Sequence, residues 1–260
     1  MLLAIDVGNT NVTAGLFRGS RLLSRGRVPT HASLRSLLRG MRVPPHEVGA
    51  VILSSVVPRA TASLKRSLKE LFHFRPLILG ENVRAPIKNR YRVPSQVGQD
   101  RLVNGAGAFF LYGGPAIVVD FGTAVTLDLV SARREYLGGL IVPGVGIALE
   151  ALVSNAALLP GIPLAPPSEF LGRDTRQSMR SGLFHGYGAL CDGLVRRLKS
   201  EHAPRAKVIA TGGHCRLLAP FCHAVQIVNP DLTLQGLRLT YEQSQKIPKN
   251  RLTKSSLNIR

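Results

Sequence analysis

Apolar residues occur along the chain in two patterns: short continuous runs, which are typical of buried strands, and longer segments in which they recur at helical spacing. The segment 2–28 predicts three antiparallel strands, since its apolar runs are separated by polar turns. Further strands are expected at 48–57, 77–79, 116–119, 125–130, 135–141, 207–210 and 225–228. Helices are expected at 32–39, 58–72, 99–112, 147–157, 176–201 and 232–243, with a short one around Leu217 and Leu218. Strands that alternate with helices predict an α/β fold.

A polar turn that carries one aspartate occurs twice, each time between two predicted strands. The first copy is Asp6-Val7-Gly8-Asn9-Thr10-Asn11, and the second is Asp120-Phe121-Gly122-Thr123. Glycine and asparagine tolerate tight turns, and the successive N–H groups of such turns bind phosphate. One copy alone fits an ordinary hairpin equally well. Because the motif recurs in the same order, we expect a duplicated domain pair that holds a nucleotide and its cation between two acidic turns.

The chain length sets the expected organisation. The 260 residues suffice for one large domain or two small ones, and a hydrophobic content of 45% supports a packed core. We expect an N-terminal domain at 1–113, a C-terminal domain at 114–245 and a basic flexible tail at 246–260. No apolar run approaches the roughly 18 residues of a membrane span, and 1–5 is too short for a signal peptide. A cytoplasmic protein is therefore expected.

Net charge is +19, from 34 basic and 15 acidic residues, which would suit a polyanionic partner. The basic residues are spread over the chain, and aromatic residues make up only 5% and do not alternate with them. We therefore favour a solvated basic surface that attracts anionic substrates over nucleic-acid binding. The three cysteines, Cys191, Cys215 and Cys222, match no zinc spacing and are expected to be reduced and packed.

Seven short motifs, taken together and in this order, resemble the type III pantothenate kinases, which belong to the actin-like, sugar kinase and Hsp70 ATPase superfamily. They cover residues 2–243. The motifs are Asp6-Val7-Gly8-Asn9-Thr10-Asn11, Gly98-Gln99-Asp100-Arg101-Leu102-Val103-Asn104, Asp120-Phe121-Gly122-Thr123-Ala124, Gly138-Gly139 with Pro143-Gly144, Gly172-Arg173-Asp174-Thr175, Ser181-Gly182-Leu183 and Thr211-Gly212-Gly213. The resemblance implies duplicated ribonuclease H-like (actin-like ATPase) domains, each a mixed sheet flanked by helices.

The resemblance also implies ATP-dependent phosphorylation of pantothenate, the first step of coenzyme A synthesis, by a homodimer with the pantothenate site near the subunit interface. Asp120 matches the family's ligand for a monovalent cation, K⁺ or NH₄⁺, and we expect Asp6 to hold Mg²⁺ through water. Expected ATP contacts are Asp6, Val7, Gly8, Asn9, Thr10, Asn11, Val12, Thr13, Thr123, Gly212 and Gly213. Expected pantothenate contacts are Tyr91, Gly98, Gln99, Asp100, Arg101 and Thr175.

Asp100 is the expected catalytic base, which accepts the proton of the primary hydroxyl of pantothenate as that oxygen attacks the γ-phosphate. The alternative is an acid at a helix start that serves stability alone. Arg101 suits the substrate carboxylate, although a surface salt bridge fits it equally well. Two other functions stay open: a regulatory or nucleic-acid-associated protein derived from the kinase, and a kinase of another small hydroxylated substrate such as a sugar or acetate.

Overall fold

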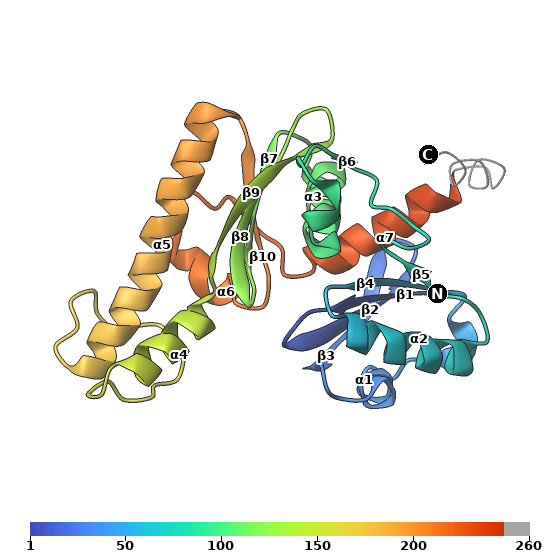
Figure 1. Ribbon diagram of the computed structural model, residues 1–260, viewed down its shortest axis with the longest axis horizontal. Helices are drawn as coiled ribbons and strands as arrows, with labels where there is room; N and C mark the ends of the chain where they lie inside the picture. Colours follow the sequence, from blue (N-terminus) through green and yellow to red (C-terminus); the bar gives the residue numbers. More distant parts are fainter. Residues whose placement is uncertain (247–260) are drawn as a thin grey trace. The chain divides into compact units, whose positions relative to one another are not determined.

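The computed structural model describes residues 1–246, so the expected tail beyond Lys246 lies outside the described residues. Contacts divide the chain into two compact units (Figure 1). Unit 1 comprises Met1–Pro86 together with the chain from Leu234 onward, and unit 2 comprises Ile87–Thr233.

Unit 1 is built on a five-stranded mixed sheet in the order β3-β2-β1-β4-β5. The first three strands are antiparallel, and β4 and β5 run parallel to β1. The strands are β1 (Leu2–Val7), β2 (Asn11–Arg18), β3 (Arg21–Pro29), β4 (Ala50–Ser55) and β5 (Leu77–Ile78). Because β1 and β4 are parallel, both present their carboxyl ends, Val7 and Ser55, at the same edge of the sheet.

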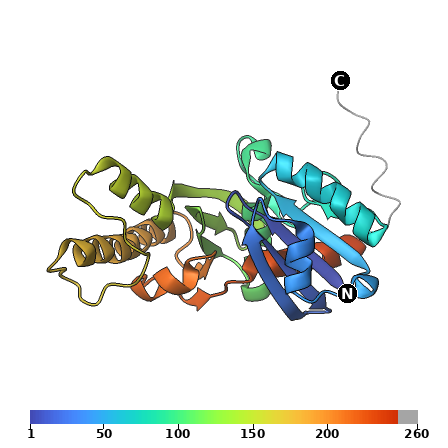
Figure 2. The same cartoon turned by 90° about the horizontal axis from the view of Figure 1, so that it is seen from below.

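Helices cover both faces of this sheet. Leucines of α1 (Leu34–Gly40) and α2 (Pro58–Phe72) share a buried core with alternate residues of β1, β2 and β4. The other face meets α7 (Leu232–Gln245): a Cβ at Gly15 would touch Leu234 of that helix. Figure 2 shows this layering, with α7 in red behind the blue strands and α2 in cyan in front.

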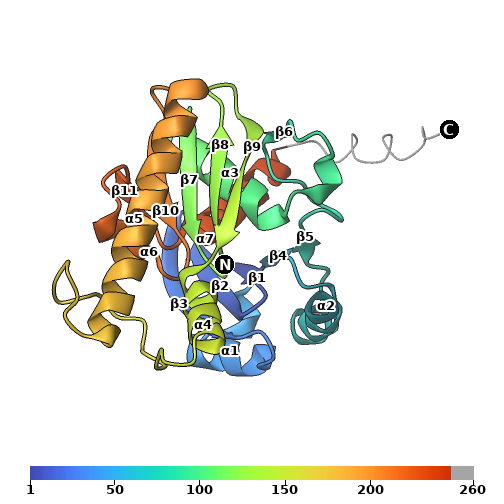
Figure 3. The same ribbon diagram turned by 60° about the vertical axis from the view of Figure 1, so that its left-hand side comes forward.

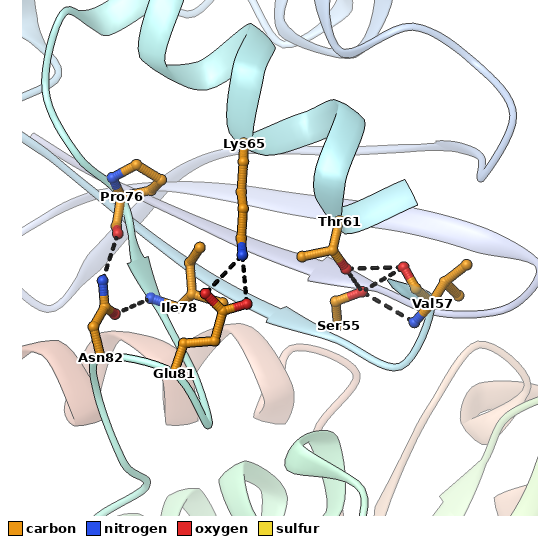
Figure 4. A network of polar contacts seen from close by, with 8 residues as sticks. All are labelled: Ser55, Val57, Thr61, Lys65, Pro76, Ile78, Glu81 and Asn82. Carbon is orange, nitrogen blue, oxygen red and sulfur yellow. Dashed lines mark hydrogen bonds and ion pairs between the residues drawn. The ribbon is translucent and has the colours of Figure 1, made fainter. Parts of the chain in front are cut away.

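Polar contacts fix the segment that follows β4 (Figure 4). Thr61 Oγ1 in the first turn of α2 donates to Ser55 Oγ at 2.6 Å, and Ser55 Oγ accepts from Val57 N at 3.1 Å. Pro58 occupies the first helical position, where its missing N–H costs nothing. Further along, Lys65 Nζ donates to Glu81 Oε2 at 2.6 Å, and Asn82 Oδ1 accepts from Ile78 N at 2.6 Å. These contacts hold the carboxyl ends of β4 and β5 in place.

Unit 2 repeats the strand pattern in a six-stranded mixed sheet of order β11-β10-β7-β8-β9-β6. The strands are β6 (Lys88–Asn89), β7 (Ala116–Phe121), β8 (Ala124–Val130), β9 (Glu135–Pro143), β10 (Lys207–Thr211) and β11 (Ile227–Val228). Helix α3 (Gln99–Tyr112) covers one face, and the long helix α5 (Thr175–Glu201) packs on the core of the other (Figure 3). Helices α4 (Val145–Asn155) and α6 (Cys215–Leu218) complete the unit.

The expected fold class is confirmed: both units contain a mixed sheet flanked by helices. Helices α2 and α3 begin and end at the expected residues. Helices α1 and α5 begin at Leu34 and Thr175, since Ser33 and Asp174 cap them by accepting from a backbone N–H three residues on. The segment 84–98, for which the sequence pattern predicts neither a strand nor a helix, contains β6, which pairs with β9.

The two contact units do not follow the expected domain limits at 113 and 245. Helix α3 groups with unit 2 because it packs on β7 and β8, and the chain from Leu234 groups with unit 1. The limits therefore stay a prediction about independently folding domains. No helix in residues 1–246 is both long and apolar enough to cross a membrane. All three cysteines are buried, and none of them forms a disulfide within residues 1–246, as expected.

Candidate active site

The first acidic turn lies at the carboxyl end of β1 in unit 1. Gly8 N donates to Asn11 O at 2.9 Å and closes the turn, while Thr30 Oγ1 donates to Gly8 O at 2.8 Å from beyond β3. Asn9 and Thr10 are exposed at the tip. Val7 and Val12 are buried in the core, so only their backbone atoms could contact a nucleotide. The turn is therefore a rigid, exposed backbone loop beside one carboxylate.

Two hydroxyl residues flank Asp6 in the sheet. Asp6 lies directly opposite Thr13 on β2 and opposite Ser54 on β4. Alternation places Ser54 on the same sheet face as Asp6, since Ile5, Val7 and Leu53 pack in the opposite core. Ser54 is fully buried, and its hydroxyl has no hydrogen-bond partner among the described residues. The sequence pattern did not single it out, although the register of two parallel strands places it beside the acid.

The second acidic turn lies at the carboxyl end of β7 in unit 2. Asn104 Nδ2 on α3 donates to Asp120 Oδ2 at 2.9 Å, and Thr233 Oγ1 in turn donates to Asn104 Oδ1 at 2.7 Å. Burial, with the neighbouring Asp100 and Asp128 charges as smaller causes, raises the pKa of the Asp120 carboxyl to about 7, while the hydrogen bond from Asn104 lowers it. A bound cation would stabilise the ionised form of a carboxyl group with this pKa.

The loop after β10 closes around Asp120. Gly212 adopts φ +91, and a Cβ there would collide with Asp120 Oδ1, so glycine is required. His214 N donates to Phe121 O at 3.0 Å and ties this loop to the second turn. Thr123 and Gly213 are exposed at the same end of the sheet.

Thr211 occupies the same position in the sheet of unit 2 that Ser54 occupies in the sheet of unit 1. It lies opposite Asp120 on the parallel neighbour strand, is 1% exposed, and its hydroxyl lacks a hydrogen-bond partner in the described part of the chain. Both acidic turns thus have a buried hydroxyl beside the acid.

Asp100 lies in the first turn of α3, on the same sheet face as Asp120. Its Oδ1 accepts from the backbone N–H of Arg101 at 2.9 Å. Burial raises the pKa of Asp100, and the Asp128 charge adds to this, against the Arg101 N–H and guanidinium. A raised pKa makes this carboxylate a stronger base, as a proton acceptor requires.

Arg101 is not a surface residue. Its guanidinium forms an ion pair with Asp128, Nη2 to Oδ1 at 2.6 Å, and only 10% of its side chain is exposed. Tyr136 OH also donates to Asp128 Oδ1, at 2.8 Å, and Tyr91 lies with its ring centre 6.3 Å from that of Tyr136. Asp128 and Tyr136 were not expected at the site, because nothing in the strand pattern of 125–141 distinguishes an inward acid from a solvated one.

Thr175 is separated from these groups by the sheet. It is exposed at the start of α5, and α5 packs on the face opposite to α3. Unit 2 therefore brings together Asp100, Arg101, Asp120 and Tyr91, but not Thr175. Gly98, the residue that caps α3, and Gln99, its first residue, are both partly exposed beside Asp100.

Among residues 1–246, no group of three or more His, Cys, Asp or Glu side chains could hold a metal ion. The available donors are single carboxylates next to hydroxyls and backbone carbonyls. Such a set fits a weakly bound monovalent ion at Asp120, where Gly212 leaves room, and a hydrated Mg²⁺ near Asp6, since Mg²⁺ keeps several waters.

Comparison with known proteins identifies relatives along nearly the whole chain. The family model described as type III pantothenate kinase matches residues 2–197. A protein of Moorella thermoacetica named type III pantothenate kinase is 41% identical over 253 residues, which is 94% of this chain and 100% of the relative. One of the same name from Myxococcus xanthus is 42% identical over 250 residues, 93% of this chain and 98% of that one.

Solved structures share the fold at low identity. A conserved putative Baf family transcriptional activator from Campylobacter jejuni aligns with TM-score 0.61 and 19% identity, covering 94% of this chain and 100% of its own. An activator of 2-hydroxyisocaproyl-CoA dehydratase from Clostridium difficile, with bound ADPNP, aligns with TM-score 0.58 and 10% identity, covering 95% and 98%. MreB 5 of Spiroplasma citri, bound to AMPPNP, aligns with TM-score 0.52 and 10% identity over 94% of this chain and 97% of its own. These likenesses show the actin-like ATPase fold.

Proposed function

This chain belongs to the type III pantothenate kinase family, and from that premise we propose which residues carry out the reaction. The family phosphorylates pantothenate with ATP in coenzyme A biosynthesis. The observation that carries the assignment of roles is the group of three carboxylates and one guanidinium on the α3 face of unit 2. The test of the activity is release of ADP that depends on pantothenate.

Asp100 is the general base in this proposal. Phosphoryl transfer requires a positioned acceptor oxygen and stabilisation of charge more than covalent chemistry. Asp100 accepts the proton of the primary hydroxyl as that oxygen bonds to the γ-phosphorus and ADP leaves. The buried position of Asp100, which raises its pKa, supports this role.

ATP phosphates bind to the first turn, with Asp6 and the backbone N–H groups of residues 8–11 as the binding groups. Mg²⁺ belongs with ATP and neutralises phosphate charge when bound, and Asp6 would hold it through water. Thr123, Gly212 and Gly213 are the nucleotide contacts of the second turn. Thr123 and Gly213 are exposed and Gly212 is partly exposed at this end of the sheet, and the two glycines have no side chains to fill the space, which supports this.

Asp120 is the site of the monovalent cation, K⁺ or NH₄⁺. Burial raises the pKa of Asp120 most, and the charges of Asp100 and Asp128 raise it as well, so a cation would stabilise its ionised form. Arg101 binds the pantothenate carboxylate, since a planar guanidinium suits a planar anion. Tyr91 lies beside Gly138, whose hypothetical Cβ would be 3.8 Å from its ring, and provides an apolar wall for the substrate. The cytoplasmic location expected from the sequence stays a prediction.

The protein acts as a homodimer through α5 and neighbouring segments. Three glycines of α5, Gly182, Gly186 and Gly193, have open space where a Cβ would be, whereas a Cβ at Gly188 would collide with Phe221 O. Each open glycine costs the helix about 1 kcal/mol relative to alanine without any contact that requires it. Large apolar side chains are also exposed in this part of unit 2: Ile147, Leu152, Leu158, Phe170, Leu171 and Leu190.

Such a face supports a partner of the same chain. A second copy would also explain why Thr175, at the start of α5, is expected at a pantothenate site that α3 forms on the other face of the sheet.

Gly186→Arg is therefore expected to abolish the dimer, because a long charged side chain would replace a close helix contact. Light scattering after size exclusion should give twice the mass of one chain for the wild type and the mass of one chain for the variant. Gly40→Arg is the matched control, since Gly40 in α1 also has open space at its Cβ. A wild-type monomer, or an unaffected Gly186→Arg dimer, would contradict the proposed interface.

A further inference from the structure

The ion pair of Arg101 and Asp128 joins the first turn of α3 to the middle of β8. Nε donates to the carboxylate oxygen Oδ1 at 2.9 Å, and Nη2 lies 2.6 Å from the same oxygen as an ion-pair contact without hydrogen-bond geometry. The Asp128 side chain is not exposed at all. The pair is thus a long-range, desolvated contact between a helix start and the sheet beneath it.

Both oxygens of Asp128 have further donors. Tyr136 OH donates to Oδ1 at 2.8 Å, and Thr126 Oγ1 donates to Oδ2 at 2.9 Å. The Arg101 Cζ lies 5.8 Å from the centre of the Tyr136 ring, which adds a cation–π contact. The carboxylate is therefore held by its own strand and by β9, and the guanidinium is held by that carboxylate and ring.

A glycine on β9 leaves the space that the pair occupies. Gly139 lies opposite Asp128 in the β8–β9 register. A Cβ there would collide with the backbone oxygen of Leu127, and it would also lie 2.6 Å from Asp128 Oδ1 and 2.8 Å from Arg101 Nη2. A side chain at position 139 would therefore disturb both the neighbouring strand and the ion pair.

A buried ion pair is a poor way to stabilise a fold, since well-packed apolar residues often do as well or better. Here the contacts of Asp128 and Tyr136 hold the side chain of Arg101. The backbone N–H of Arg101 in turn donates to the Asp100 carboxylate. Nε donates to Asp128, Nη2 is buried close to it, and a guanidinium has five N–H donors, so Nη1 keeps donors for an anion. These features indicate that the pair orients Arg101.

We propose that Asp128 is a positioning residue for the kinase reaction: with Tyr136 it fixes the Arg101 guanidinium in the orientation that receives the substrate carboxylate. This rests on the proposed role of Arg101. Asp128 contacts no substrate, and its effect on pantothenate binding goes through Arg101. Its loss should weaken pantothenate binding and leave ATP binding unchanged.

The test is a set of double-mutant cycles in the full-length enzyme, read as KM for pantothenate and for ATP. Asp128→Asn leaves the guanidinium without its counter-charge and is expected to raise KM for pantothenate by about tenfold or more. Tyr136→Phe removes one hydrogen bond and should raise it by about threefold, with the fold intact. KM for ATP should change in neither variant. In an Arg101→Met background, neither substitution should raise KM for pantothenate any further.

Tyr112→Phe is the matched control, because it removes a tyrosine hydroxyl that accepts from Asn229 at the far end of the same helix. It should leave both KM values unchanged. If Asp128→Asn does not fold, the Tyr136→Phe cycle carries the test alone. Effects of Tyr136→Phe that persist in the Arg101→Met background overturn the inference. An unchanged pantothenate KM in Arg101→Met itself would instead overturn the proposed role of Arg101.

Discussion

Asp100→Asn is expected to lower kcat by about a thousandfold or more, in the upper range for removal of a general base. The amide keeps the size of the side chain and can still accept from the Arg101 N–H, but it cannot take a proton. The pKa of Asp100 is raised in the folded protein, so its contribution to stability is lost as pH rises through the folded pKa. The neutral variant should therefore melt at neutral pH no lower than the wild type. Steady-state kinetics and thermal melting measure the two effects.

Asp192→Asn provides the control for Asp100→Asn. Its carboxylate accepts from the backbone N–H groups of His223 and Ala224, at 3.0 Å and 2.8 Å, and has no role in the proposed chemistry. It should lose some stability and keep its kcat. A folded Asp100→Asn enzyme with kcat near the wild-type value would leave Asp100 as a residue that serves only the helix start.

Asp120→Asn is expected to lower kcat by about a hundredfold, similar to removal of one preorganised electrostatic group, and to remove activation by K⁺. The wild type should be active in K⁺ or NH₄⁺ and much less active in Na⁺, since a large, weakly hydrated ion suits one carboxylate with neutral oxygens around it. Rates in the three salts at constant ionic strength measure this. Equal wild-type rates in all three would reject the cation site.

The raised pKa of Asp120 gives the cation site a defined pH dependence. The cation competes with a proton on a carboxyl whose pKa is about 7, so apparent K⁺ affinity should rise with pH and level off above about 7. Without K⁺, the contribution of Asp120 to stability is present below its unfolded pKa and is lost as pH rises through about 7. The gain in melting temperature from K⁺ should therefore be larger above that pH than below it. An affinity that falls with rising pH would contradict the site.

Local signals in the sequence were sufficient for much of the fold. Pro58 marks the start of α2, and the glycines at 98 and 113 bracket α3, so these helices have the expected limits. The duplicated acidic turn predicted a duplicated domain pair, because the turn and its flanking strands are contiguous in the chain, and the family resemblance implied the two mixed sheets. Strand β6 was missed, since two polar residues carry no hydrophobic pattern and pair with a strand more than forty positions away.

Long-range partners within the candidate site were not predictable. Arg101 and Asp128 are 27 positions apart, and only the register of β8 under α3 makes them an ion pair. The same holds for Ser54 and Thr211, which are beside the acids because β4 and β10 are parallel to β1 and β7. Alternation predicts which residues face inward, but it cannot tell which of them meet.

The most direct test of the account is ADP release by the full-length protein with ATP, Mg²⁺ and K⁺, measured with and without pantothenate. We expect rapid release only with pantothenate, with one phosphorylated pantothenate formed for each ADP, and none above background with glucose or acetate in its place. ADP release that is the same with and without pantothenate would contradict the assignment of these residues to a pantothenate kinase site.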